Sequence, residues 1–155
     1  YKDNKYHEAS EVYLEALCGF SFESEPKARV KELNHTLKVP ILNNLVLLLM
    51  KRNLHGNASV MADQVLDIDP DNFKAHLRKA ESLVVIEELA KAEKEIEICQ
   101  QLASSREEKL EVQDLFKRYK VKEQKEKQFA KEAMSKSMYQ DKPLPPAAPI
   151  DPNID

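Results

Sequence analysis

Residues 41–72 read ILNNLVLLLMKRNLHGNASVMADQVLDIDPDN, and this stretch decides the fold. Its first part, 41–53, is an apolar run with helical spacing, which Pro40 can open from a first-turn position. A turn at 54–57 separates this run from a second helical segment at 58–68. The stretch therefore predicts two helices joined by a short turn.

A second pair of helices is expected directly after the first. The polar tetrapeptide at 69–72 ends the first unit, and its Asp71 or Asn72 can cap the next helix. Residues 73–86 and 89–103 again show helical spacing of apolar side chains. The predicted unit of two helices thus occurs twice.

The two pairs repeat with a period of 34 residues. Ala58 and Ala92 are separated by this interval, and side chains this small let paired helices approach closely. Larger residues such as Leu66 and Ile96 are expected to fill the space between units. The same interval relates three further pairs of positions: Asn44 and Arg78, Val46 and Ala80, and Leu49 and Leu83.

Helical structure is also expected before the first pair. Residues 1–17 place one apolar face at helical spacing, made by Tyr6, Ala9, Tyr13, Ala16 and Leu17. Residues 18–40 form a mixed region punctuated by one glycine and two prolines, within which 28–37 can be helical.

The chain is expected to end in a long helix and an extended tail. Ser104 or Ser105 can cap a helix over 106–136. The first half of this helix carries an apolar face for packing, made by Val112, Leu115, Phe116 and Tyr119. Its second half is rich in Lys, Glu and Gln and is expected to project into solvent. Residues 140–155 contain five of the eight prolines and predict an extended segment.

A unit of two helices with this period resembles the tetratricopeptide repeat. The resemblance extends over residues 1 to about 137 and implies an all-α fold, a short solenoid of helix pairs. It divides the chain into a partial first repeat (1–17), a linker (18–40), a second repeat (41–72), a third (73–104), a C-terminal helix (105–137) and an extended Pro-rich tail (138–155). The long linker and the charged final helix are similar to immunophilin co-chaperones of the FK-binding, cyclophilin and aryl-hydrocarbon-receptor-interacting types.

The resemblance also implies a binding site. Chaperone-binding members hold the Glu-Glu-Val-Asp tail of heat-shock chaperones, of the ninety- or seventy-kilodalton class, in a carboxylate clamp. By resemblance, Asn44 matches the Asn of the second repeat, and Lys74 and Arg78 match the Lys and Arg of the third. The Lys and Asn of the first repeat would lie upstream of Tyr1.

The chemistry of these residues suits an anionic ligand. Lys74 and Arg78 are spaced i, i+4, so they share a helix face, where we expect no facing acid. Arg can bind a carboxylate through two hydrogen bonds, Lys supplies a point charge, and the Asn44 amide can donate. The alternative interpretation of Lys74 and Arg78 is an ordinary solvated helix face.

Two other functions stay open at this level. The first is a structural adaptor whose repeats and tail are embedded in a larger assembly. The second is a protein with a peptidyl-prolyl isomerase domain upstream, which the immunophilin resemblance implies. These residues carry no enzyme signature, and we therefore predict a non-enzymatic interaction module.

Composition excludes several classes of protein. The chain has 155 residues but only two glycines and two cysteines, too few for phosphate-binding loops, disulfide scaffolds or cysteine-rich zinc sites. No cofactor is expected, and a net charge of -3 gives no basic field for nucleic acid. The longest apolar run, 45–50, is too short to span a membrane. Two unpaired cysteines favour a reducing compartment, so we expect a cytoplasmic protein.

The remaining reactive side chains have structural explanations. Cys18 and Cys99 stand where small apolar residues pack, so we expect both to fill the core. The histidines have no spacing typical of metal ligands, and we expect surface or turn positions for His7, His35, His55 and His76.

A basic stretch near the C-terminus is a weaker candidate for binding. It includes Lys117, Arg118 and Lys120, and aromatic residues are interspersed with its basic ones. Such a helix could contact calmodulin or another acidic surface. Its apolar face is broken, however, so a solvated helical extension is favoured.

Overall fold

The computed structural model describes residues 2–19 and 25–140, so 141–155 of the predicted tail lie outside the described part. These residues form helices and turns without any strand, which confirms the all-α prediction. The helices are α1 (Lys2–Cys18), α2 (Lys27–Leu33), the π-helical turn η1 (Asn34–Lys38), α3 (Val39–Lys51), α4 (His55–Ile68), α5 (Phe73–Val85), α6 (Leu89–Leu102) and α7 (Arg106–Gln140). The chain divides into two units, residues 1–123 and 124–155.

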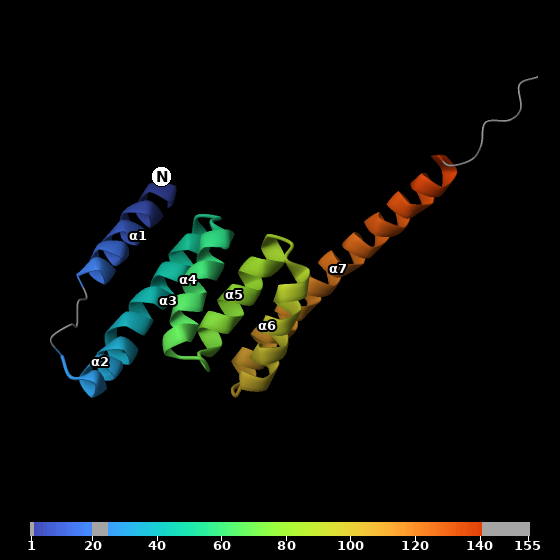
Figure 1. The fold of residues 1–155 in the computed structure, drawn as a ribbon. Coiled ribbons are helices and arrows are strands. Elements are labelled where there is room, and N and C mark those ends of the chain that lie inside the picture. The colour runs from blue at the N-terminus through green and yellow to red at the C-terminus, as the bar shows by residue number, and fades with distance from the viewer. Residues whose placement is uncertain (1, 20–24, 141–155) are drawn as a thin grey trace, which may run out of the picture. The chain divides into compact units, whose positions relative to one another are not determined.

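The first unit is built from two antiparallel helix pairs, α3 with α4 and α5 with α6 (Figure 1). Each of the four bounds of the second pair lies 34 residues after the corresponding bound of the first. Helix α4 packs on both α3 and α5, and α1 packs on α3. The two predicted units are therefore helix pairs that recur with a 34-residue period.

The turns inside the two pairs have the same backbone conformation. Asn53 and Glu87, which are 34 residues apart, are the non-glycine residues with positive φ in the described segments, at 58° and 64°. In both turns the next residue donates its backbone N–H to the carbonyl five residues back, at 2.9 Å and 3.0 Å. Such a left-handed residue satisfies the last carbonyls of a helix. Here it does so without the glycine that usually occupies this position.

Side chains cap α5 and α7 at the predicted boundaries. The Asn72 side chain accepts a hydrogen bond from the Ala75 N–H at 3.1 Å and so starts α5. At the start of α7 the Ser105 hydroxyl accepts from the Glu108 N–H at 3.1 Å. The Glu108 carboxylate accepts in return from the N–H groups of Ser104 and Ser105, which lowers the pKa of Glu108. This reciprocal pattern is a capping box.

Pro40 lies in the first turn of α3, as predicted, but helical backbone also precedes it. Helical backbone runs without a break over 27–51, so the predicted linker at 18–40 is helical from residue 27, which includes 28–37. Within η1 the Val39 N–H bonds to the Asn34 carbonyl, five residues back. A proline inside a helix lacks an N–H and clashes with the carbonyl four residues back. The wider turn immediately before Pro40 accommodates that conflict.

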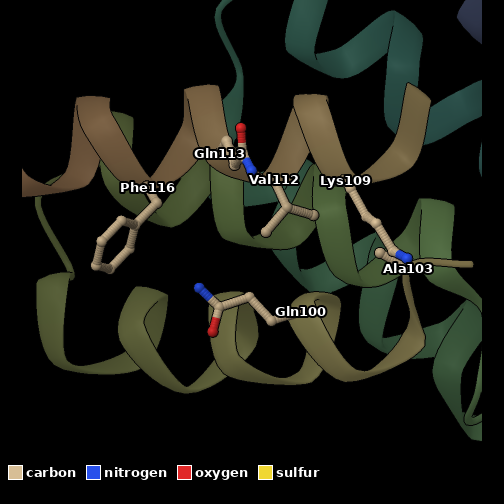
Figure 2. A pocket seen from close by; sticks show the side chains of 6 residues that line it. All are labelled: Gln100, Ala103, Lys109, Val112, Gln113 and Phe116. Atoms are coloured by element: carbon tan, nitrogen blue, oxygen red, sulfur yellow. The ribbon is translucent and has the colours of Figure 1, made fainter. Parts of the chain in front are cut away.

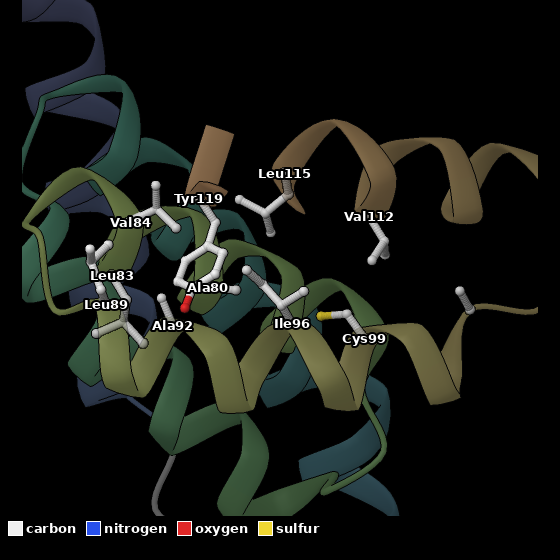
Figure 3. Packing of buried hydrophobic residues seen from close by; sticks show 11 residues of the cluster. Ala80, Leu83, Val84, Leu89, Ala92, Ile96, Cys99, Val112, Leu115 and Tyr119 are labelled. Atoms are coloured by element: carbon white, nitrogen blue, oxygen red, sulfur yellow. The ribbon is translucent and has the colours of Figure 1, made fainter. Parts of the chain in front are cut away.

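Each helix pair has a buried apolar cluster, and a third cluster of Val39, Leu42, Val65 and Ala75 joins α3 and α4 to α5. Ala58 and Ala92 are both fully buried, one in the cluster of each pair, as their small size predicts. Helix α7 adds Val112, Leu115 and Tyr119 to the second cluster, beside side chains of α5 and α6 (Figure 3). The first part of α7 is therefore a packing element of the second pair.

Two predictions about exposure have different outcomes. Residues 124–137 of α7 are exposed, as the absence of an apolar face predicts. Cys99 is buried, but Cys18 is exposed, so the expectation that both cysteines fill the core is wrong for Cys18. Cys18 is the last residue of α1, and the neighbouring Leu17 packs against the apolar clusters in its place.

Candidate peptide-binding groove

A hollow of about 330 Å³ opens on the face that α3, α5 and α7 share. We call it the α3–α5–α7 groove. It is lined by Leu47, Lys74, Leu77, Arg78, Glu81, Glu111, Asp114 and Arg118. Two of the three residues predicted to bind a carboxylate, Lys74 and Arg78, therefore lie in one concave site.

Lys74 has an uncompensated charge in this groove. Its side chain is exposed and makes no hydrogen bond or ion pair with any residue that the structure describes. It stands one turn before Arg78 on α5, as the i, i+4 spacing predicts. The Lys74 ammonium group is thus available to a ligand without breaking an existing contact.

Arg78 is already engaged within the fold. Its guanidinium donates a hydrogen bond to the Asn43 carbonyl of α3 at 2.6 Å. Burial lowers the pKa of Arg78, although the charges of Glu81 and Glu111 oppose that effect. Arg78 therefore ties α5 to α3 and gives the groove a positive charge of restricted mobility.

Asn44 contacts α1 and does not line the groove with the two cations. It is exposed, its side-chain amide donates to the Tyr13 hydroxyl at 3.3 Å, and it is not among the residues that line the groove. The preceding Asn43 is half-buried, donates to the Asn72 side chain at 3.4 Å, and leaves its own side-chain oxygen without a partner. Of the three residues predicted to bind a carboxylate, Lys74 and Arg78 therefore line the groove, whereas Asn44 contacts α1.

Acidic side chains also line the groove, so the expectation of no facing acid is wrong. Glu81 lies on α5 itself, and Glu111 and Asp114 come from α7. Arg118 donates to Glu81 at 2.8 Å, while Glu111 makes no hydrogen bond or ion pair within the described segments. Sequence reasoning missed Glu111 and Asp114 because only the packing of α7 against α5 brings them to the groove.

The three basic residues of α7 predicted as contacts are each paired with an acidic side chain. Lys117 contacts Asp114 at 3.4 Å, and Arg118 contacts Glu81 as described. Lys120 contacts Glu123 at 3.0 Å and lies 5.3 Å from the ring centres of Phe116 and Tyr119. The three predicted contact residues therefore present a nearly compensated charge rather than a basic patch.

A second hollow of about 270 Å³ lies between α6 and α7. Its lining residues are Gln100, Ala103, Lys109, Val112, Gln113 and Phe116. Val112 and Phe116 point from α7 toward α6, and Gln100 points toward them (Figure 2). Because Phe116 remains 38% exposed, this hollow presents an aromatic edge to solvent.

His76 is buried, contrary to the expected surface or turn position. Its Nδ1 lies 2.7 Å from Glu95 and its Nε2 lies 2.8 Å from the Pro70 carbonyl. Lys79 bonds both Glu95, at 2.6 Å, and Asp63, at 2.7 Å. We call His76, Lys79, Glu95 and Asp63 the polar cluster. It joins α4, α5 and α6, and we assign it a structural role.

Charge in the polar cluster is held by mutual pairing. Burial disfavours the charged form of Lys79, but hydrogen bonds to Asp63 and Glu95 outweigh burial and raise the pKa of Lys79. Within the described residues no three His, Cys, Asp or Glu side chains are arranged to hold a metal ion. The polar cluster is therefore read as an internal ion-pair network.

No helix of the described segments is both long and apolar enough to cross a membrane. Comparison with known proteins finds no protein-family model that matches the chain and no matching curated protein.

Proposed function

We propose that this chain is a tetratricopeptide-type peptide-binding module of the immunophilin co-chaperone kind. In this proposal the α3–α5–α7 groove binds the acidic C-terminal tail of a heat-shock chaperone of the ninety- or seventy-kilodalton class. The module acts by binding and catalyses no reaction. The observation that supports this most is the uncompensated Lys74 ammonium in a groove lined by α7 and by the first helix of each of two pairs with a 34-residue period.

Lys74 is the central residue of the proposed site, with Arg78 beside it. A carboxylate of the peptide bonds Lys74, and Arg78 adds positive charge from a position fixed by the Asn43 carbonyl. Asn44 contributes its amide where the peptide continues toward α1. Leu47 and Leu77 give the groove an apolar component for the Val side chain of the tail.

Calorimetric titration of the 155-residue chain with acetyl-Glu-Glu-Val-Asp, as free acid and as C-terminal amide, tests the proposal. The free acid binds and the amide binds much more weakly. Lys74→Ala weakens binding about tenfold to a hundredfold, because a charge-assisted hydrogen bond contributes roughly 1.5–3 kcal/mol. Lys94→Ala removes the same charge from an exposed position on α6 outside the groove and leaves affinity unchanged.

Lys74→Ala is a better probe than Arg78→Ala, because Arg78 also supports the contact between α5 and α3. Binding also weakens as salt is added, since exposed charges are screened. Equal affinity of the parent and Lys74→Ala for the free acid would refute the proposed site.

A structural adaptor is the second candidate, favoured by the hollow between α6 and α7 with its exposed Phe116. A folded chain that binds neither peptide would favour the adaptor. The proline-rich segment and the hollow beside Phe116 would then be the surfaces to test with crosslinking.

A further inference from the structure

In the α3–α5–α7 groove, one cation and one carboxylate make no hydrogen bond or ion pair in the described part of the chain. Lys74 on α5 is a cation without a partner, and Glu111 on α7 is an exposed carboxylate without a hydrogen bond or ion pair in the described part of the chain. Among the other charged groups, Arg118 pairs with Glu81 and Lys117 with Asp114. Arg78 is bonded to the Asn43 carbonyl, and the charge of Glu111 acts on it without forming an ion pair. The groove is therefore dipolar from α5 to α7.

A purely acidic ligand does not match this pattern. Its carboxylates gain from Lys74, but any negative group that reaches α7 approaches Glu111 and is repelled. Like charges brought together at a binding surface oppose association and so select against such partners. A ligand that matches both Lys74 and Glu111 therefore carries one acidic and one basic group.

We propose that the peptide bound in this groove carries, close to the carboxylate held by Lys74, a Lys or Arg side chain that pairs with Glu111. The inference rests on the proposed function and specifies its ligand further. Lys74 and Glu111 line one hollow of about 330 Å³. A hollow of that volume is roughly 9 Å across and an extended peptide advances about 3.3 Å per residue, which places the two charges within about three residues of each other.

Peptide titrations on the 155-residue chain test the charge pattern. The reference is acetyl-Ala-Ala-Ala-Glu-Glu-Val-Asp, and three analogues each replace one Ala by Lys. Three matched analogues carry Gln at the same positions and separate the effect of charge from that of size. We expect one Lys analogue to bind at least fivefold more tightly than the reference, and its Gln counterpart to bind like the reference.

Two variants locate the basic subsite. In Glu111→Gln the gain of the Lys analogue falls below twofold, while the reference peptide binds at least as well as to the parent. Glu107→Gln makes the same change in the first turn of α7, outside the groove, and keeps the gain. This control separates Glu111 from a general attraction of Lys to a chain of net charge -3. Circular dichroism of each variant verifies that the helices are retained.

The possible failures are distinguishable. If no Lys analogue binds more tightly than the reference, or if the gain persists in Glu111→Gln, the basic subsite is refuted. When the reference peptide still binds and Lys74→Gln weakens it, the proposed function stands without that subsite. If no peptide binds to the folded chain, both proposals are wrong.

Discussion

Removing Glu95 from the polar cluster should destabilise the fold strongly. Glu95 is 8% exposed and lies 2.7 Å from His76 Nδ1 and 2.6 Å from Lys79 Nζ. In Glu95→Met both groups lose their carboxylate, and removing one partner of a buried charge pair costs about 3–5 kcal/mol. Lys79 retains Asp63, so we expect a loss near the lower end, about 3 kcal/mol. Domains are stabilised by only about 5–15 kcal/mol, so this loss is large.

The chain itself supplies the matched control. The positions 34 residues before His76, Lys79 and Glu95 are apolar, and they are Leu42, Leu45 and Met61. The triple variant His76→Leu/Lys79→Leu/Glu95→Met therefore gives the second helix pair the side chains that the first pair has at these three positions. Asp63 stays in this variant, but its side chain is 53% exposed and remains solvated. Replacing buried ionic groups by apolar residues is often neutral. The triple variant also loses the hydrogen bond to the Pro70 carbonyl, so we expect its stability within about 1 kcal/mol of the parent.

Urea denaturation followed by circular dichroism measures both variants. The slope of the free energy of unfolding against urea should be unchanged, so that shifts in the midpoint report stability alone. A Glu95→Met variant within 1 kcal/mol of the parent would refute the buried-charge argument. A triple variant as unstable as Glu95→Met would refute the expectation that the apolar residues of the first pair can replace the ionic residues of the second.

Three further predictions concern single sites. Asn72→Ala should destabilise the chain by about 1 kcal/mol in urea denaturation, because the hydrogen bond that caps α5 is lost. Asn53→Ala should lower the free energy of unfolding by roughly 0.5–1 kcal/mol in the same assay, because Ala tolerates the positive φ of this turn, 58°, less well than Asn. An unchanged midpoint would contradict a backbone cost at this φ. Burial, with nearby acidic charge, raises the pKa of Cys99 to about 12, so iodoacetamide at pH 8 should modify Cys18 quickly and Cys99 only after unfolding.

The raised pKa of Cys99 also sets a direction for stability at high pH. The folded chain keeps this proton up to about pH 12, whereas the unfolded chain releases it near the ordinary thiol value. The contribution of Cys99 is therefore fully present below that ordinary value and is lost progressively as the pH rises toward 12. Cys99→Ser should reduce the fall in midpoint between pH 8 and pH 10.

Helix pairs were predictable from sequence because their signals are local. Apolar spacing within each helix and the polar residues that end it are read from adjacent positions, and Asn72 and Ser105 cap where expected. Pro40 occupies the first turn of α3 as expected, but the π-helical turn before it continues the helical backbone toward the N-terminus, which the sequence did not indicate. A change from i−4 to i−5 hydrogen bonding leaves no clear pattern in the sequence.

The candidate site was predictable only in part, for a different reason. The shared face of Lys74 and Arg78 follows from spacing along one helix. The contact of Arg78 with the Asn43 carbonyl and the approach of Glu111 depend on how three helices pack. The burial of His76 could not be predicted from the sequence either, because its partners, Glu95 and the Pro70 carbonyl, lie on other elements.

Lys74 and Arg78 have different physical roles in the structure, although the sequence predicted the same role, binding a carboxylate, for both. The Arg78 guanidinium already donates a hydrogen bond to the Asn43 carbonyl at 2.6 Å. A ligand that binds all of its donors must therefore break that bond. Lys74 has no such bond to lose, and only solvation opposes its pairing with a carboxylate. Affinity for an acidic group should therefore depend more on Lys74 than on Arg78, whereas stability should depend more on Arg78. The opposite ranking would mean that the ligand displaces Arg78 from α3, and the groove would then be formed only on binding.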